Sequence, residues 1–305
     1  MPTVGASTMV KVGKRQLNLS NLEKPLYPSG FTKGEVAEYY IRIAPVMLPY
    51  LKGRAITLKR YPNGSAAPFF FEKRCPSHKP DWVRTAEIMS RRNEWMVRYC
   101  VIDDLATLVW AANLAALELH APLAIATKPD RPTAMVFDLD PTVPATLLDC
   151  LRLGIRLRDR LKKLGLRCFA KTSGNKGLHM YVPLNTAATF DQTKTFARDV
   201  ADQLVAEDPT HVTANMSKAQ RGGKVFVDWS QNDRHKTTVC AYSLRAGPSP
   251  TVSTPITWFE LESALAARDV ERLKFGPSEA LDRVEGRGDA FRPVLEIKQK
   301  LPHLS

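Results

Sequence analysis

The stretch Met135-Val136-Phe137-Asp138-Leu139-Asp140-Pro141 reads as a short strand with two carboxylates near its end. Because successive side chains of a strand point to opposite faces, Asp138 and Asp140 lie on one face and Phe137 and Leu139 on the other. The two Asp Cα atoms would then be roughly 6.5–7 Å apart, so both carboxylates could reach one pair of divalent ions. Taken alone, the stretch is read more simply as a buried strand that ends in an Asp-Pro turn.

The charge balance is the unusual feature of the composition. The chain has 305 residues, 44% of them hydrophobic, which is enough for one large domain or two intimate subdomains. It contains 44 Lys and Arg residues against 31 Asp and Glu residues, a net charge of +13. A surface with this excess attracts polyanions, and nucleic acid is the first candidate; a basic enzyme without such a partner is the alternative.

The cysteines are scattered along the chain and odd in number: Cys75, Cys100, Cys150, Cys168 and Cys240. This pattern argues against a disulfide framework and favours a reducing cytosol. Cys75 and His78 have the spacing of half a zinc site, but no second pair follows at a suitable distance, so structural zinc is not expected. We find no signal-peptide pattern and no run of membrane-spanning length, so no membrane partner is expected.

The order of predicted elements indicates an α+β protein, because strands run into hairpins and helices follow on the outside. The proline-rich segment 121–132 is the expected junction between two subdomains. We expect a loose basic arm over residues 1–16, a domain over 17–290 with an N-terminal subdomain at 17–121 and a catalytic core at 133–250, and a helical tail over 291–305.

Two predicted helices carry residues of interest. Thr32 begins the first, so Lys33 lies where a cation opposes the helix dipole and an anionic partner is expected. The second is predicted from Asp104 to His120, with Asp103 as its cap. A histidine at a helix C-terminus usually compensates the dipole, and a role in a site is the alternative.

Phe69, Phe70 and Phe71 are consecutive and are followed by Lys73 and Arg74. Three such side chains cannot all point inward from one strand, so at least one is exposed or packs on a second layer. Exposed aromatic rings among cations are what a base-stacking surface needs, and a two-layer core is the rival interpretation.

A second strand, residues 224–230, carries Asp228 near its end and repeats the layout of the first stretch. Three acids on two strands are the minimum for a two-metal site, and oxygen ligands suit Mg²⁺ or Mn²⁺. Between the strands lies Ser173-Gly174-Asn175-Lys176-Gly177-Leu178-His179, whose glycines let backbone N–H groups approach an anion. Alone, this segment is a hairpin turn more often than a phosphate loop, and it lacks the P-loop pattern.

In this order, the acidic strand, the Ser-Gly-x-Lys-Gly-x-His hairpin and the second acidic strand resemble the archaeo-eukaryotic primase superfamily. Within it, the chain is similar to the polymerase domain of bacterial ligase D, the end-joining ligase, and to stand-alone primase-polymerases. The resemblance runs from about Leu17 to about Val284, and residues 21–28, 59–64, 70–73, 225–232 and 242–245 also match. It implies a primase-polymerase fold with two mixed β-sheets flanked by helices and an RRM-like catalytic subdomain.

The resemblance also implies roles for individual residues. The metal ligands would be Asp138, Asp140 and Asp228. The residues that hold the incoming nucleotide would be His120, Ser173, Lys176, His179, Gln231 and Arg245. The residues that grip a DNA 5′-phosphate would be Asn21, Lys24 and Lys33. Phe70 and Phe71 would stack beside the template, and Arg221 matches a basic residue on the loop before the last acidic strand.

The implied activity is a DNA-dependent nucleotidyltransferase that fills short gaps or break ends with two metal ions, Mn²⁺ or Mg²⁺. It would use NTPs or dNTPs with a preference for ribonucleotides. Residues 128–131 lack the glycine of a ligase motif, so no ligase is expected in this sequence, which would be an isolated domain or a stand-alone enzyme. Its basic start and extra C-terminal helices favour a stand-alone enzyme, expected in the cytoplasm and associated with the nucleoid. A separate ligase and Ku are its expected partners. A non-catalytic DNA-end-binding module and a two-metal nuclease are the alternative functions.

Overall fold

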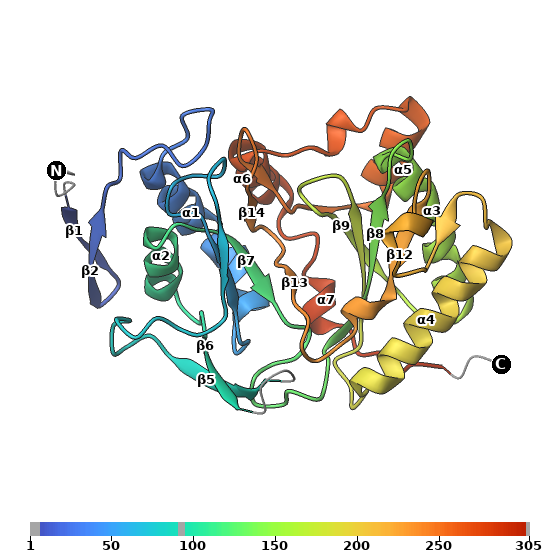
Figure 1. Cartoon of the computed structure of the whole chain (residues 1–305), viewed down its shortest axis with the longest axis horizontal. Coiled ribbons are helices and arrows are strands. Elements are labelled where there is room, and N and C mark those ends of the chain that lie inside the picture. The colour runs from blue at the N-terminus through green and yellow to red at the C-terminus, as the bar shows by residue number, and fades with distance from the viewer. Residues whose placement is uncertain (1–6, 91–94, 303–305) are drawn as a thin grey trace.

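The computed structural model describes residues 7–90 and 95–302. It shows the expected α+β architecture, in which two large sheets lie side by side and helices cover their outer faces (Figure 1). The larger sheet has six strands and the smaller has four. The expectation of two mixed sheets is wrong for the smaller sheet, because all its pairings are antiparallel.

The six-stranded sheet contains the opening stretch as its third strand. Its strands, in spatial order, are β11 (Val212–Thr213), β12 (Val225–Asp228), β8 (Ala134–Pro141), β10 (Leu178–Pro183), β9 (Phe169–Thr172) and β16 (Pro255–Ile256). Only β11 and β12 are parallel. The alternation predicted for β8 is confirmed, since Met135, Phe137 and Leu139 are fully buried against the outer helices. Those helices are α3 (Leu147–Lys163), α4 (Phe190–Glu207) and α5 (Trp258–Ala267).

The four-stranded sheet has the order β13 (Thr238–Val239), β7 (Ala116–Ala121), β3 (Thr57–Arg60) and β4 (Phe70–Glu72). Leu58, Leu117 and Leu119 point from it into a core shared with α1 (Lys33–Leu51) and α2 (Leu105–Asn113). Glu118 and His120 alternate with these leucines and therefore lie on the opposite face. In each sheet, polar side chains therefore lie on the face opposite the hydrophobic core.

The remaining elements are short or peripheral. Two further hairpins are β5 (Thr85–Met89) with β6 (Met96–Cys100), and β14 (Leu244–Arg245) with β15 (Thr251–Val252). The single-turn helices are η1 (Lys218–Gln220), η2 (Trp229–Gln231) and η3 (Glu271–Leu273), and the chain ends with α6 (Pro277–Arg287) and α7 (Pro293–Glu296). No helix in the described ranges is both long and apolar enough to span a bilayer.

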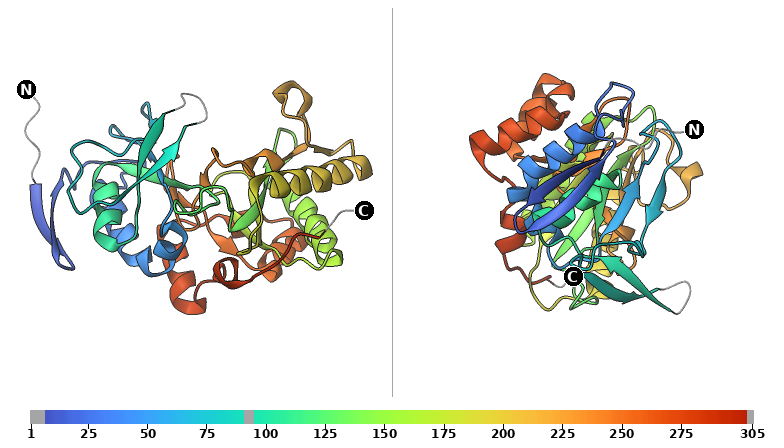
Figure 2. Two further views of the ribbon diagram at one scale, coloured as in Figure 1. Left: turned by 90° about the horizontal axis from the view of Figure 1, so that it is seen from below. Right: turned by 90° about the vertical axis from the view of Figure 1, so that its left-hand side faces the viewer.

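Three local expectations are wrong. Residues 7–16 are not a loose arm, because β1 (Ser7–Val12) and β2 (Arg15–Ser20) form a hairpin at one end of the molecule (Figure 2). The second helix ends at Asn113, where Ala115 adopts a φ of 56° that a helix cannot contain, so His120 lies on strand β7. In the described part of the C-terminal tail, residues 291–302, only α7 is helical, and residues 297–302 follow it without regular structure.

The expectation of no disulfide is also wrong. Cys75 and Cys100 are bonded and join the segment after β4 to the end of β6. The sequence could not show this pairing, because the two residues are 25 positions apart and belong to an odd set of cysteines. Cys150, Cys168 and Cys240 are free and buried, and the bond removes Cys75 from any zinc site.

The amide of Asn232 joins the end of β12 to the middle of β8. Its side-chain oxygen accepts from Val136 N–H at 2.8 Å, and its Nδ2 donates to Val136 O at 2.7 Å and to Trp229 O at 2.9 Å. Asn232 is fully buried, so these groups have no access to water. The amide therefore fixes the turn after Asp228 against the strand of Asp138.

Replacing Asn232 with Ala should lower the free energy of unfolding by about 3 kcal/mol, because buried backbone groups of β8 lose their partners. Urea denaturation of the whole chain measures this change. Gln16→Ala, at an exposed amide on β2, is the control and should change it by less than about 0.5 kcal/mol. Equal effects of the two substitutions would contradict the role of Asn232.

Candidate active site

The predicted acids lie on one face of the six-stranded sheet. Strands β8 and β12 are antiparallel, and Asp228 is the direct partner of Asp138. Asp140 is two residues further along β8 and so shares their face. On the other side of Asp138, the direct partner on β10 is His179, whose own partner on β9 is Lys171. Four ionisable side chains thus form a row across four neighbouring strands.

The electrostatics of this row centre on Asp138. Burial raises the pKa of Asp138, the nearby charges of Asp140 and Asp228 raise it further, and it reaches about 8. Lys171 and Arg245 act in the opposite direction without cancelling the rise. His179 Nε2 lies 3.3 Å from Asp138 Oδ1, and burial holds the pKa of His179 well below its ordinary value. The acids therefore need further positive charge to be ionised together.

The donor set fits a hard divalent cation in its chemistry, because carboxylate oxygens are the ligands that Mg²⁺ and Mn²⁺ prefer. The side chains have not converged around a common point, however. Within residues 7–90 and 95–302, no three His, Cys, Asp or Glu side chains are grouped closely enough to hold a metal ion as they stand. Asp228 instead accepts from Ser230 N–H at 3.0 Å and from Gln231 Nε2 at 2.7 Å. Gln231 is thus bonded to a predicted metal ligand.

The loop between β9 and β10 closes tightly beside the acids. The Ser173 hydroxyl oxygen accepts from Asn175 N–H at 3.2 Å and from Gly177 N–H at 3.0 Å. Lys176 Nζ donates to Pro141 O at 2.9 Å, so the lysine lies at the end of the acidic strand. A Cβ at Gly177 would be 2.6 Å from Leu139 O, which explains why the close approach to β8 requires glycine.

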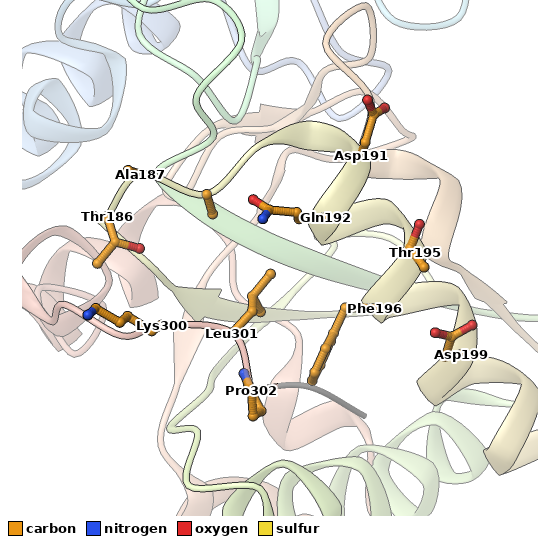
Figure 3. A pocket seen from close by; sticks show the side chains of 11 residues that line it. Thr186, Ala187, Asp191, Gln192, Thr195, Phe196, Asp199, Lys300, Leu301 and Pro302 are labelled. Atoms are coloured by element: carbon orange, nitrogen blue, oxygen red, sulfur yellow. The ribbon is translucent and has the colours of Figure 1, made fainter. Parts of the chain in front are cut away.

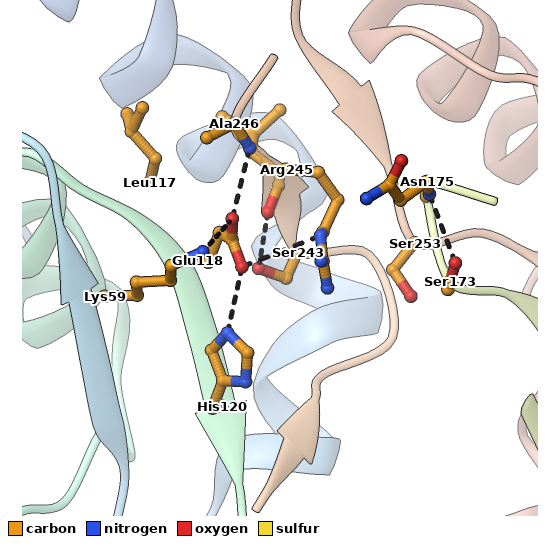
Figure 4. Close-up of polar contacts among 12 residues, drawn as sticks. Lys59, Leu117, Glu118, His120, Ser173, Asn175, Ser243, Arg245, Ala246 and Ser253 are labelled. Carbon is orange, nitrogen blue, oxygen red and sulfur yellow. Dashed lines mark hydrogen bonds and ion pairs between the residues drawn. The ribbon is translucent and has the colours of Figure 1, made fainter. Parts of the chain in front are cut away.

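The four-stranded sheet supplies the opposite wall, with Glu118 at its centre (Figure 4). One oxygen of Glu118 accepts from Lys59 Nζ at 3.2 Å, Tyr61 OH at 3.0 Å and Ala246 N–H at 3.3 Å. The other oxygen lies 3.0 Å from His120 Nε2 and 3.6 Å from Arg245 Nε. Sequence analysis missed Glu118 because a single acid in a buried strand has no motif.

A cavity of about 320 Å³ lies between the two walls. It is lined by every residue predicted to bind the nucleotide, namely His120, Ser173, Lys176, His179, Gln231 and Arg245, together with Asp138 and Asp140. In the described part of the chain, His179 Nδ1 and Arg245 Nε are buried and have no hydrogen-bond partner. Arg245 Nε still forms a longer ion pair with Glu118, at 3.6 Å, whereas a polar ligand in the cavity would satisfy His179 Nδ1.

A larger cavity of about 600 Å³ lies elsewhere, between the start of α4 and residues 300–302 (Figure 3). Asp191, Asp199 and Lys300 are its charged residues, and none of the predicted site residues lines it. Its size therefore gives no reason to move the active site from the smaller cavity.

The predicted 5′-phosphate residues are brought together near the start of α1. Lys24 Nζ donates to Pro62 O at 2.7 Å, and Lys33 Nζ donates to Ser20 O at 2.6 Å. Burial lowers the pKa of Lys33 to about 8, and the charges of Lys24 and Arg60 contribute to this shift. Asn21 adopts a φ of 55° in the adjoining turn. Lys33 Nζ thus donates to a backbone carbonyl and not to a carboxylate near the start of the helix.

All three consecutive phenylalanines are exposed, by 50% for Phe69, 44% for Phe70 and 53% for Phe71. The two-layer core is therefore not observed. Phe71 contacts His120 edge-on, with the ring centres 5.8 Å apart, so the aromatic surface adjoins the nucleotide wall. Arg221, in the loop before β12, stacks on Phe226 with its guanidinium 3.4 Å from the ring centre.

The similarity of the chain to known proteins agrees with this arrangement. A family model described as the primase-polymerase domain of LigD matches residues 32–291. The multifunctional non-homologous end joining protein LigD of Mycolicibacterium smegmatis is 40% identical over 282 residues, which are 92% of this chain and 36% of that protein. The bifunctional non-homologous end joining protein LigD of Bacillus subtilis is 32% identical over 90% of this chain and 44% of that protein. The chain thus spans less than half the length of these relatives.

A solved structure is similar throughout. The polymerase domain of Mycobacterium tuberculosis ligase D, in complex with DNA, superposes with a TM-score of 0.84 and 37% sequence identity. The match covers 93% of this chain and 99% of that one. The resemblance read from the acidic strands and the hairpin between them is therefore confirmed, and the chain belongs to the family of LigD primase-polymerase domains.

Proposed function

We propose that this chain is a DNA-directed nucleotidyltransferase that extends a DNA strand at short gaps or break ends during end joining. The observation that carries the proposal is the register of β8 and β12, which makes Asp228 the direct partner of Asp138 beside the loop at residues 173–177. Membership of the LigD primase-polymerase family supports the same reaction. The similarity to non-homologous end joining proteins of two bacteria supports the end-joining context.

Asp138, Asp140 and Asp228 would hold two divalent ions, Mg²⁺ or Mn²⁺. When bound, these ions activate the 3′-hydroxyl and stabilise the charge on the leaving pyrophosphate. The chain itself supplies the geometry. Ser230 and Gln231 orient the Asp228 carboxylate through the hydrogen bonds described above. On the opposite side of the acids, Lys176 and Arg245 line the cavity as cations that can clamp a triphosphate.

The proposed DNA contacts extend outward from the cavity. Phe70 and Phe71 would stack beside template bases, which suits their exposure next to His120. Lys24 and Lys33, with Asn21, would bind the 5′-phosphate on the far side of the gap. Arg221 would reach DNA only by leaving Phe226, so we assign it a structural role in the free protein and a DNA contact in the complex.

We further propose that ribonucleotides are preferred over deoxyribonucleotides, and that a separate ligase seals the product with Ku as a partner at broken ends in the nucleoid. The similar polymerase domain of M. tuberculosis ligase D is in complex with DNA, which supports DNA as the polymer that this chain binds. The parts 17–121 and 133–250 would act as two subdomains that meet at the cavity, where His120 comes from the first part and Asp138 and Asp140 come from the second. Strand β13 of the second part pairs with β7 of the first and so joins the two parts.

Asp228→Asn should reduce nucleotide incorporation by about a thousandfold or more, because one oxygen anion is lost where the ions would bind. DNA affinity should remain within about threefold, since the acids contribute no attraction to phosphate. Extension of a gapped, 5′-phosphorylated duplex and a parallel DNA-binding titration measure the two quantities. Asp202→Asn, at an exposed acid of α4, is the matched control.

The same assay separates the alternative functions. Incorporation that survives in Asp228→Asn would contradict the assignment of the acids. Strong 5′-phosphate binding with no incorporation in the unsubstituted chain would indicate an end-binding module. Shortening of the primer without consumption of triphosphate would indicate a nuclease.

The depressed pKa of Lys33 predicts a pH dependence of 5′-phosphate recognition. A bound phosphate favours the charged lysine, and the free protein loses that charge as the pH rises through about 8. The preference for 5′-phosphate over 5′-hydroxyl ends should therefore be constant below pH 8 and fall by up to about tenfold per pH unit above it.

Binding titrations with the two kinds of gapped duplex, from pH 7 to 9.5, measure this preference. Lys33→Gln serves as the control, since its remaining preference should no longer change with pH in this range. A preference that stays constant to pH 9.5 in the unsubstituted chain would contradict the role of Lys33.

A further inference from the structure

We propose that Glu118 is the positioning residue of the nucleotide site. It fixes His120 so that its ring presents an unprotonated nitrogen to a hydroxyl of the bound nucleotide, and it anchors the guanidinium of Arg245. The inference rests on the proposed nucleotidyltransferase function and assigns a role to a residue outside the motifs of the chain. The observations that carry it are the contacts of the Glu118 carboxylate, which is only 2% exposed.

The hydrogen bond between Glu118 and His120 determines which ring nitrogen carries the proton. An ionised carboxylate can only accept, so His120 Nε2, 3.0 Å from the carboxylate oxygen, must be the donor. Burial raises the pKa of Glu118, but the bond from His120 and the charges of Arg245 and Lys59 outweigh burial and bring it to about 2. The carboxylate is thus ionised at neutral pH.

The second nitrogen of His120 is then a hydrogen-bond acceptor. Burial lowers the pKa of His120 below its ordinary value, so the ring is neutral near pH 7 and Nδ1 keeps its lone pair. His120 lines the cavity, and its bond to Glu118 uses Nε2, which leaves Nδ1 for a ligand. Figure 4 shows this nitrogen on the side of the ring away from Glu118. Such an acceptor binds a sugar hydroxyl and repels a phosphate oxygen, so His120 reads the sugar rather than the triphosphate.

Arg245 is held from the same carboxylate. Its Nε lies 3.6 Å from Glu118, and its Cγ would be only 2.6 Å from a Cβ at Gly174. The arginine side chain therefore runs between the Glu118 wall and the loop of Ser173. Contacts with both walls therefore determine where Arg245 lines the cavity.

A carboxylate is required at residue 118 because cations converge on it. Lys59 Nζ lies 3.2 Å from Glu118 and also 4.2 Å from the centre of the Phe69 ring, next to the aromatic surface. A neutral side chain would leave Lys59 and Arg245 facing one another with no anion between them. The alternative is that Glu118 only neutralises these buried charges and so stabilises the fold without affecting the ligand.

The substitution Glu118→Gln separates the two roles, since it keeps the shape and removes the charge. We expect the Kd of the whole chain for ATP, measured by calorimetry with Mg²⁺ and without DNA, to rise about tenfold. Glu260→Gln is the control, because burial raises the pKa of Glu260 while hydrogen bonds and charges, chiefly from Arg283, bring it to about 2, as at Glu118. The Glu260→Gln substitution should lower the stability of the fold and leave the Kd for ATP unchanged.

His120→Ala completes a double-substitution cycle. If Glu118 acts through His120, the Kd of the double variant should be far lower than the product of the two separate effects predicts. An unchanged Kd in Glu118→Gln, or fully additive effects, would overturn the proposal and leave Glu118 a stabilising residue.

The protonation of His120 gives a test that needs no variant of Glu118. Nitrogen NMR of the ¹⁵N-histidine-labelled chain at pH 7, assigned by comparison with His120→Ala, should show a neutral ring with its proton on Nε2. A proton on Nδ1, or a charged ring, would overturn the proposal. These measurements involve no polymerisation, so they can contradict the role of Glu118 without contradicting the proposed function. The proposed function is contradicted if the intact chain incorporates no nucleotide.

Discussion

The repulsion among three carboxylates on one sheet face is the constraint on which the site depends. Asp138 lies between Asp228 on one side and His179 on the other, and burial together with its acidic neighbours raises the pKa of Asp138 to about 8. A protein does not retain such a cluster for stability, since burying like charges opposes folding. The surrounding cations, which include Lys171 and Arg245, reduce this cost without removing it. The remaining deficit of positive charge is what bound metal ions would supply.

The two large sheets contribute different groups to the site. The six-stranded sheet places the acids and the loop at residues 173–177, and its other face is closed by the cluster that contains Phe137. The four-stranded sheet presents Glu118 and His120 from strand β7, with Leu117 and Leu119 packed behind them. Strands therefore hold Asp138, Asp140, Glu118 and His120 in fixed positions, whereas Lys176 lies on the short loop between β9 and β10 and can adapt to a ligand.

Local patterns in the sequence were sufficient to predict the acidic strands, the helix start at Thr32 and the hairpin between β9 and β10, because each depends on neighbouring residues. His120 was placed on a helix because residues 105–117 are mostly apolar and residues 104–121 contain no glycine or proline that would mark the end of α2. The left-handed turn at Ala115 is imposed by tertiary packing, which local propensity does not report. Glu118 and Lys171 were missed for a related reason, since a buried charge is recognised only when its partners on other strands are known.

The central claim is that Asp138, Asp140 and Asp228 bind the ions that drive nucleotidyl transfer. The most direct measurement is a crystal structure of the chain with gapped DNA, a non-hydrolysable nucleoside triphosphate and Mn²⁺, with the ions located by anomalous scattering. The account predicts two anomalous peaks about 3.5–4 Å apart, both within coordination distance of these carboxylates, with the triphosphate between them and Lys176. A triphosphate bound in the cavity with no ion at the three acids, or ions bound elsewhere, would contradict it.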